Sequence, residues 1–358
     1  MNRIPQIKIF LASTLVLVIS ACGKQEANST PSSVKAKKQE SSSLFSCIPS
    51  DFPAIGRIDI SKISQIKEVQ KEVEENKSLP YYKELHDAGL EMANIDSVIF
   101  GLKPDITPQN FGRTKAVILI RAKNNISLAK IAELIERNNK TKLEKIKIQN
   151  MDGYILSDKQ TNSSEKVTVF QLQNNVLGIV SKDMADKLII GSTKGISVLN
   201  NAELMKLSDN ARMKNMFWIA AVIPKELYKN AKADTPKIIS GFVSLDYTKE
   251  ILQIAGTIYC PDKENLQKII QPLQLVSSFI VMNPAYGIKP EDISLKPNNN
   301  RLDINVKLTK TVLDNIARSQ KQAKQVSDKQ ATGPQLDMAA EGLGYPDTEA
   351  AEKSSPLK

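Results

Sequence analysis

The sequence predicts an α+β protein with two tandem, related halves, each an antiparallel or mixed sheet with helices packed on one face and ferredoxin-like elements. Three observations support this fold class. A strand-like apolar run at Ala116–Ala122 precedes a helical pattern, and the same pair of patterns recurs at Ile254–Cys260. Each half then continues with a candidate hairpin and a short helix. The two helices share one apolar spacing, that of a single buried stripe: Leu128, Ile131, Ala132 and Ile135, then Leu266, Ile269, Ile270 and Leu273.

The first half, residues 46–205, begins with a predicted strand at Ala54–Ile60. A helical stretch follows at residues 61–92. We expect two helices there, separated near Ser78-Leu79-Pro80, because proline disfavours a helix interior. Ile95–Leu102 is the predicted second strand of this half.

An additional strand at Gly153–Leu156 distinguishes the first half from the second. The predicted hairpin of the first half pairs Lys166–Gln173 with Val176–Ser181. Its turn is Asn174-Asn175, and asparagine tolerates the left-handed backbone that tight turns need. A short helix is predicted at Met184–Ile190.

The second half, residues 206–320, repeats this order in a shorter form. A strand at Phe217–Ile223 precedes a short helix from Pro224, a residue suited to the first helical turn. The remaining predicted elements are a strand at Ile238–Tyr247, a hairpin of Ile293–Lys296 and Arg301–Leu308 around Asn298–Asn300, and a helix at Thr311–Ala317. The order is β-α-β-β-α-β-β-α twice, which contains a split β-α-β unit. The alternative is a generic α+β protein whose elements merely look alike.

The N-terminal segment has the three parts of a secretion signal. Arg3 and Lys8 give it a positively charged start, an apolar run extends from Ile9 to Ile19, and small residues precede Cys22. The apolar part is roughly eleven residues, too short to cross a hydrocarbon core of about 30 Å as a permanent helix. Residues 1–21 are therefore predicted to be a signal peptide.

The last residues of this signal, Ile19-Ser20-Ala21-Cys22, resemble the lipobox of bacterial lipoproteins. The resemblance implies that Cys22 becomes the first residue of the mature chain. It would carry a diacylglyceryl thioether and often an amide-linked acyl chain such as palmitate, so that the chain's partner is a membrane. In enterobacterial lipoproteins an Asp after the cysteine signals inner-membrane retention. Gly23 stands here, so the resemblance favours the outer membrane, facing the periplasm.

The composition of the rest of the chain is that of a soluble protein with polar flanks. The full sequence is 41% hydrophobic and 25% charged, while residues 22–45 and 321–358 contain few large apolar side chains. Such segments bury too little surface to offset their ordering entropy, so we expect a disordered tether and a disordered tail. The net charge of +10 is spread along the chain, usually beside acidic residues, and nucleic acid is therefore not an expected partner.

No metal or cofactor site is expected. His86 is the single histidine, whereas an imidazole metal site needs two or three, and we expect it on a helix surface. Cys22 is assigned to the lipid. Cys47 and Cys260 then remain, either as a disulfide in an oxidising compartment or as unpaired, buried thiols.

No catalytic residue is predicted either. Ser64 and Lys67 have the S-x-x-K spacing of penicillin-binding proteins, and Ser208-Asp209-Asn210 spells their second motif, but no K-T-G follows. Gly191–Gly195 does not have the order of a phosphate loop and is expected to end a helix. Asp59 lies between Ile58 and Ile60, at an outward-facing position of the predicted strand. From the sequence, neither Asp59 nor Asp96 can be distinguished from a surface carboxylate at a strand end.

The expected function is that of a lipid-anchored envelope protein acting as a non-catalytic binding or scaffold module, with a possible envelope protein partner. The alternative is a carrier of a lipophilic or other small ligand in a groove between the halves. Aromatic residues gather in the second half and are suited either to such a groove or to core packing: Phe217, Trp218, Tyr228, Phe242, Tyr247 and Tyr259.

Overall fold

The computed structural model describes residues 44–104, 114–139, 142–148, 151–157, 166–188, 197–211, 215–228 and 234–319. The predicted signal peptide, the lipidation site Cys22, the tail at 321–358 and Gly191–Gly195 lie outside the described residues, as does the tether before Leu44. The chain divides into two units, and the elements below lie in the first, Met1–Ala317, apart from the last two residues of the helix at 310–319.

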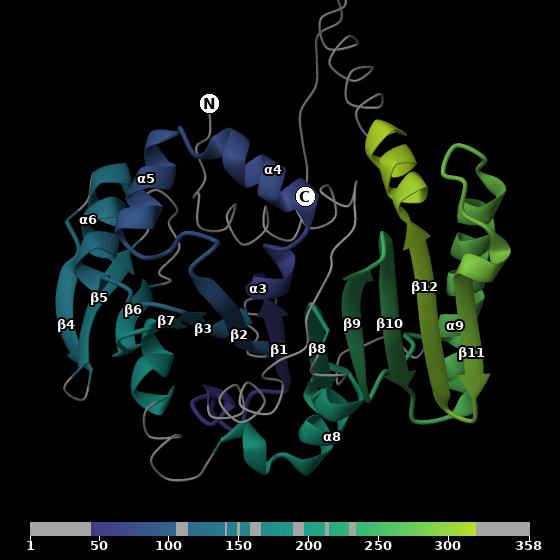
Figure 1. Ribbon diagram of the computed structural model, residues 1–358. Helices are drawn as coiled ribbons and strands as arrows, with labels where there is room; N and C mark the ends of the chain where they lie inside the picture. Colours follow the sequence, from purple (N-terminus) through teal and green to yellow (C-terminus); the bar gives the residue numbers. More distant parts are fainter. Residues whose placement is uncertain are drawn as a thin grey trace, which may run out of the picture. The chain divides into compact units, whose positions relative to one another are not determined.

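The protein has a mixed α+β fold around one large antiparallel sheet (Figure 1). The twelve strands lie in the order β11-β12-β10-β9-β8-β1-β2-β3-β7-β6-β5-β4. The strands are β1 (Ala54–Asp59), β2 (Ile95–Pro104), β3 (Thr114–Ala122), β4 (Glu144–Ile148), β5 (Met151–Ser157), β6 (Lys166–Gln173), β7 (Val176–Ser181), β8 (Phe217–Val222), β9 (Ser240–Thr248), β10 (Ile251–Tyr259), β11 (Ile293–Asn298) and β12 (Arg301–Thr309).

The centre of the sheet is the antiparallel pair of β1 and β8, in which Ile55 lies opposite Ala220. Outward from β1 come β2, β3, β7 and β6, and outward from β8 come β9, β10, β12 and β11. The expectation that each half has a sheet of its own is therefore wrong. Pairing β1 with β8 satisfies backbone groups that would form an exposed edge in each separate half.

Most helices pack against one face of this sheet, which we call the helical face. The helices on this face are α3 (Ile60–Ile63), α4 (Lys67–Asn76), α5 (Pro80–Asp87), α6 (Leu128–Asn139), α9 (Lys263–Met282) and the helix at residues 310–319. The helix α8 (Ala202–Asn210) packs instead on the opposite face, with Leu204 and Leu207 against Trp218 and Ala220. The prediction of helices on one face is thus wrong for α8.

Residues 185–188 are helical, within the helix predicted at Met184–Ile190. The structure also has short 3-10 turns: η1 (Lys182–Met184), η2 (Val198–Asn200), η3 (Lys225–Tyr228) and η4 (Pro290–Asp292). The helix predicted from Pro224 is the 3-10 turn η3. The predicted separation near Pro80 is confirmed, because α4 ends at Asn76 and α5 begins at Pro80. Sequence patterns missed β4 and α8, and the predicted boundary between residues 205 and 206 falls inside α8.

The main core lies on the face opposite the helical face, between the central strands, α8 and residues 44–52. Trp218 is fully buried there, and its ring centroid lies 5.6 Å from that of Phe45. On the helical face, Gly56 lets the rings of Phe100 and Phe217 stack with centroids 6.3 Å apart. A Cβ atom at Gly56 would lie 2.3 Å from Phe100 Cζ. Large side chains therefore meet across the β1–β8 pair from both faces.

No helix within the described residues combines the length and the apolar character needed to cross a membrane.

Candidate functional site

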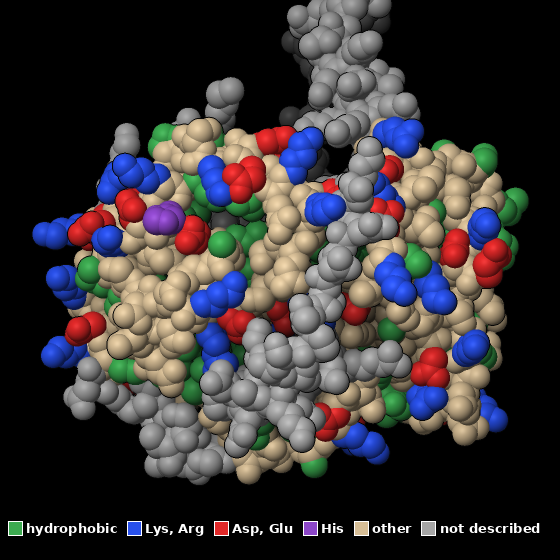
Figure 2. Space-filling view, in the orientation of Figure 1, with side chains coloured by type: hydrophobic (Ala, Val, Ile, Leu, Met, Phe, Trp, Pro, Cys, Tyr) green, Lys and Arg blue, Asp and Glu red, His purple; other side chains and the backbone are tan. Residues whose placement is uncertain are grey.

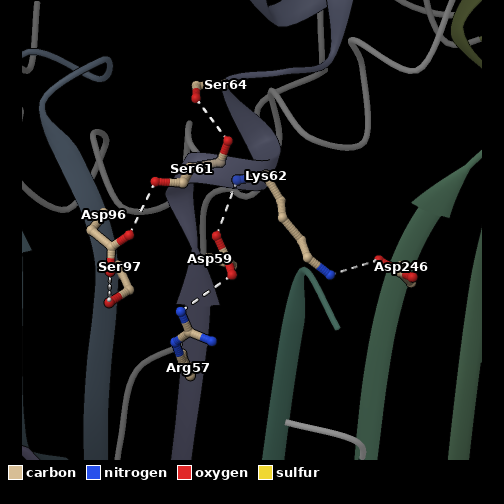
Figure 3. Close-up of polar contacts among 8 residues, drawn as sticks. All are labelled: Arg57, Asp59, Ser61, Lys62, Ser64, Asp96, Ser97 and Asp246. Atoms are coloured by element: carbon tan, nitrogen blue, oxygen red, sulfur yellow. Dashed lines mark hydrogen bonds and ion pairs between the residues drawn. The ribbon is translucent and has the colours of Figure 1, made fainter. Parts of the chain in front are cut away.

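Polar side chains gather where β1 ends, next to the junction of the two halves of the sheet (Figure 3). We call this group the seam cluster; its members are Arg57, Asp59, Ser61, Lys62, Asp96, Ser97 and Asp246. The local sequence explains how it forms. Asp59 is the last residue of β1 and the N-cap of α3, and its Oδ1 accepts a hydrogen bond from Lys62 N at 3.0 Å. Asp is among the preferred N-cap residues because its carboxylate satisfies an otherwise unpaired backbone N–H.

The seam cluster contains a largely buried ion pair. Arg57 Nη2 donates to Asp59 Oδ2 at 3.2 Å, and the two side chains are 11% and 14% exposed. Residues two apart in a strand share a face, so β1 itself sets this pair. The sequence could not distinguish Asp59 from a surface acid. Its burial depends on neighbouring strands and on α3.

A second ion pair joins the two halves of the sheet. Lys62 Nζ on α3 lies 3.8 Å from Asp246 Oδ1 on β9, and Figure 3 shows the lysine side chain reaching across to that strand. This pair is partly exposed, so it contributes little to stability. It nevertheless connects elements that are far apart in the sequence.

The remaining contacts of the seam cluster centre on Asp96, at the irregularity between Ile95 and Ser97 in β2. Ser61 Oγ donates to Asp96 Oδ1 at 3.2 Å, and Ser97 Oγ donates to Asp96 Oδ2 at 3.3 Å. Asp96 therefore holds the start of β2 against α3. These hydroxyl and carboxylate groups all serve the packing of strand ends.

The serines of the penicillin-binding pattern are also used locally. Ser64 ends α3 and its Oγ donates to Ser61 O at 3.0 Å, whereas Lys67 begins the next helix. The S-x-x-K spacing therefore does not place the two side chains on consecutive turns of one helix. Ser208 is buried, and its Oγ donates to Met205 O at 2.7 Å.

His86 and the acidic residues outside the seam cluster do not form a metal-binding group in the described ranges. His86 is exposed on α5, as predicted, with Nδ1 3.5 Å from Asp87 Oδ1 and Nε2 3.8 Å from Glu91 Oε2. Within the described ranges, no group of three or more His, Cys, Asp or Glu residues is arranged to hold a metal ion.

Both described cysteines are free thiols. Cys47 is half-buried and Cys260 is buried. Burial raises the pKa of the Cys47 thiol, partly offset by a hydrogen bond with Ser46, and burial together with nearby Asp262 raises the pKa of Cys260. Of the two alternatives left open by the sequence, the structure has the unpaired one. Thiols with raised pKa values are weak nucleophiles at neutral pH.

Among the residues that the structure describes, the large apolar side chains with the highest exposed fractions lie on the C-terminal half of α9. The exposed fractions are 58% for Leu275, 52% for Val276, 65% for Phe279 and 78% for Met282. We call these four residues the α9 surface. Figure 2 shows hydrophobic side chains along the right-hand edge, where Figure 1 shows the end of α9.

The α9 surface is exposed because it lies on the side of the helix that faces away from the sheet: Leu275, Phe279 and Met282 are opposite the buried Leu266 and Ile270. The N-terminal half packs Leu266 and Ile270 against Leu302, Ile304 and Leu295 of β12 and β11. Leu275 follows Leu266 by nine residues, which is about two and a half helical turns, and it therefore points to the opposite side of α9. The apolar stripe predicted from the sequence ended at Leu273, so the α9 surface was not predicted. The sequence did contain a signal for an apolar surface, because residues 269–288 contain no charged side chain in a chain that is 25% charged.

A carboxylate with a raised pKa lies between the two halves of the chain. Glu68 on α4 has a buried Oε1 without a hydrogen-bond partner. Burial is the largest cause that raises the pKa of Glu68 above 4.5. Its own backbone N–H and Lys310 lower the pKa, whereas Glu250 and Asp314 raise it. The folded state therefore binds this proton more tightly than the unfolded state does.

Replacing Glu68 with Gln is expected to stabilise the protein at pH 7 and to have no such effect at pH 4. The raised pKa makes the stability contribution of Glu68 greatest below its unfolded pKa and smaller as the pH rises through the folded value. Urea denaturation at the two pH values measures the difference. The same substitution at exposed Glu133 on α6 is the control, and equal effects at both sites would contradict the prediction.

No family model and no curated protein matches this chain. Among solved structures, three crystal forms of TP0453 are similar to it over 76% of its length. Form III has 8% sequence identity, a TM-score of 0.45 and 97% of its own chain covered. Forms I and IV have 9% and 8% identity, TM-scores of 0.43 and 0.42, and 96% of their chains covered. Similarity at this level does not indicate a shared function.

Proposed function

We propose that this protein is lipid-anchored in the envelope through Cys22 and acts as a non-catalytic binding module whose binding surface is the α9 surface. The observation that carries the proposal is the exposure of Leu275, Val276, Phe279 and Met282 on one helix. A soluble protein rarely exposes large apolar side chains together unless they contact a partner. The signal sequence and its resemblance to lipoproteins favour the periplasmic side of the outer membrane.

The energetics support binding at this surface. Complete burial of one Leu, Val, Phe or Met side chain contributes about 1.5–3 kcal/mol. Four such side chains, with no charged residue between Ile269 and Ile288, can offset part of the entropy lost on association. In the described part of the protein, we find no cluster of polar side chains that is exposed and grouped for a ligand in the way that these apolar side chains are.

Non-catalytic action is supported by how the seam cluster is used. Asp59 bonds to Arg57 and to the backbone of Lys62, and Asp96 accepts from Ser61 and Ser97. These groups hold strand ends and α3 together, so none of these contacts requires a substrate. We propose no cofactor, metal or nucleic acid for this protein.

We also propose that the two halves, residues 46–205 and 206–320, are related by duplication. The order of strands outward from β1 and from β8 supports this, with β1, β2, β3, β7 and β6 corresponding to β8, β9, β10, β12 and β11. In both halves a helix follows the third strand, α6 after β3 and α9 after β10. The hairpin of β4 and β5 is an addition in the first half.

The anchor is tested by metabolic labelling with a clickable palmitate. We expect the wild-type chain to take up label and the Cys22→Ala chain to take up none. Cys47→Ala and Cys260→Ala are matched controls, and both should be labelled like the wild type because they keep Cys22. Labelling that persists without Cys22 would refute the anchor.

The binding role is tested by photocrosslinking in cells. A photoreactive phenylalanine analogue at position 279 should form an adduct that the same analogue at Leu199 does not form. Leu199 is a suitable control because it is also an exposed large apolar residue, at 38%. Absence of any adduct specific to position 279 would refute the binding surface.

A ligand carrier remains a second candidate because of apolar side chains on the helical face of the central strands. Phe100, Phe217, Ile219 and Leu245 are half-buried there, and Val243 is exposed. Trp218, in contrast, belongs to the core on the other face and is unavailable to a ligand. If the protein is a carrier, mass spectrometry of the purified Cys22→Ala chain will reveal a co-purifying lipid, and a ligand-free spectrum would exclude this role.

A further inference from the structure

We infer that the partner of the α9 surface is a lipid bilayer, in which the C-terminal half of α9 lies along the interface between headgroups and acyl chains. This inference rests on the proposed function and names its partner. Leu275, Val276, Phe279 and Met282 are spaced at i, i+1, i+4 and i+7, which places them on one side of the helix. All four side chains can therefore enter one apolar phase together.

The length and polarity of this segment suit an interface. Pro272–Met282 contains no charge and spans about 16 Å as a helix, roughly half the thickness of a hydrocarbon core. A helix with such an apolar side binds a bilayer by burying it parallel to the surface. The rest of the molecule stays in water, because α9 is fixed to the sheet by its other half.

The hydroxyl groups of the two serines in this segment form hydrogen bonds within the helix, which suits an apolar environment. Ser277 Oγ donates to Gln274 O at 2.9 Å, and Ser278 Oγ donates to the same carbonyl at 2.8 Å. Their hydroxyl protons are thus satisfied within the helix. Burial of an unpaired hydroxyl would be costly, and these bonds lower that cost.

The proposed lipid anchor at Cys22 would strengthen the binding of α9 to the bilayer. Between Cys22 and the first described residue, Leu44, the chain can extend by up to about 70 Å, which is enough for any part of the protein to touch the bilayer. Anchoring makes the contact intramolecular, so a modest affinity of α9 for lipid gives high occupancy.

A second copy of the chain fits the surface less well. Four partly exposed side chains contribute on the order of 100 Å² each, or about 400 Å² per copy, whereas a stable interface buries about 800 Å² per partner. A bilayer has no such requirement for matching area.

The inference is tested with the full mature chain carrying Cys22→Ala and vesicles of phosphatidylethanolamine and phosphatidylglycerol. We expect Leu275→Gln, Phe279→Gln and Met282→Gln together to lower the partition coefficient in co-sedimentation by about tenfold or more. The matched control combines Leu79→Gln, Leu199→Gln and Ile239→Gln, three large apolar residues with 38–39% exposure elsewhere, and should bind within twofold of the parent. Binding should persist in high salt, which screens the attraction of the basic chain to anionic lipid.

Insertion itself is measured with Phe279→Trp and brominated lipid. The native Trp218 is fully buried in the core, so its emission should not be quenched. Emission from Trp at position 279 should be quenched, and emission from Leu199→Trp should not. Circular dichroism checks that the variants fold, which we expect because the substituted side chains lie at the surface.

The outcomes separate this inference from the proposed function. If the chain does not bind vesicles but self-associates through the α9 surface in sedimentation velocity, the partner is a second copy and the lipid inference is wrong. An α9-dependent protein adduct in cells without vesicle binding would likewise reject lipid and retain the binding role. If vesicle binding, self-association and crosslinking all fail to depend on α9, the proposed function is rejected as well.

Discussion

Replacing Trp218 with Ala is expected to lower the free energy of unfolding by about 3–5 kcal/mol, the cost of truncating a large buried aromatic side chain. Trp218 is fully buried on β8, directly opposite Arg57 of β1, and its ring packs against Phe45. The substitution leaves a cavity beside the strand pair that joins the two halves. The core formed by α8 and residues 44–52 loses its largest buried side chain.

Urea denaturation followed by far-UV circular dichroism measures this loss without relying on tryptophan emission. Val243→Ala on the adjacent strand β9 is the control, because Val243 is 40% exposed and its truncation should cost less than about 1 kcal/mol. Trp218→Phe should be milder than Trp218→Ala. It keeps most of the volume and removes an indole N–H that is buried without a hydrogen-bond partner. A loss similar to that of the control would contradict the central role of Trp218.

Replacing Asp59 with Ala is expected to cost about 3–5 kcal/mol, the range for removing one partner of a buried ion pair. The Arg57 guanidinium loses the carboxylate 3.2 Å away in a site where both side chains are largely buried. The N-cap of α3 is lost with the same substitution, which by itself costs about 1 kcal/mol. The expected loss is therefore large for a residue at a strand end.

Two further variants separate these contributions in the same denaturation experiment. Asp59→Asn keeps an oxygen that can cap α3 but removes the charge, so its cost should lie between those of the wild type and Asp59→Ala. Asp246→Ala breaks the more exposed pair with Lys62, at 3.8 Å, and should cost less than about 1 kcal/mol. If Asp59→Ala costs no more than Asp246→Ala, the buried pair contributes little.

The position of most strands and helices followed from local sequence patterns. Short runs rich in apolar residues predicted β1, β2 and β3, and a period near four predicted the buried stripe of α6. Proline predicted the break between α4 and α5, because its ring excludes it from a helix interior. These signals work because backbone periodicity and steric restriction act within a few residues.

The candidate site could be predicted less well, because it depends on distant segments. The sequence shows Asp59 and Asp96 as acidic residues next to apolar residues in predicted strands. Asp59 caps α3 through a local contact with Lys62, but the contact of Asp96 with Ser61 requires the pairing of β1 with β2. Lys62 meets Asp246 only because β8 pairs with both β1 and β9. The exposure of Leu275 and Phe279 likewise depends on which side of α9 packs against the sheet. An apolar helix residue has the same local sequence pattern whether or not a strand lies below it.

By itself, the sequence determined the mixed α+β composition, whereas the repeated order of elements and the signal-like N-terminus with Cys22 stay predictions. Each of these depends on residues that are near neighbours in the chain. Only the tertiary structure decided that the halves share one sheet, that α8 packs on the opposite face, and that Cys47 and Cys260 remain free. Strand pairing and burial result from contacts between residues far apart in the sequence, and a single sequence does not encode such contacts in any local pattern.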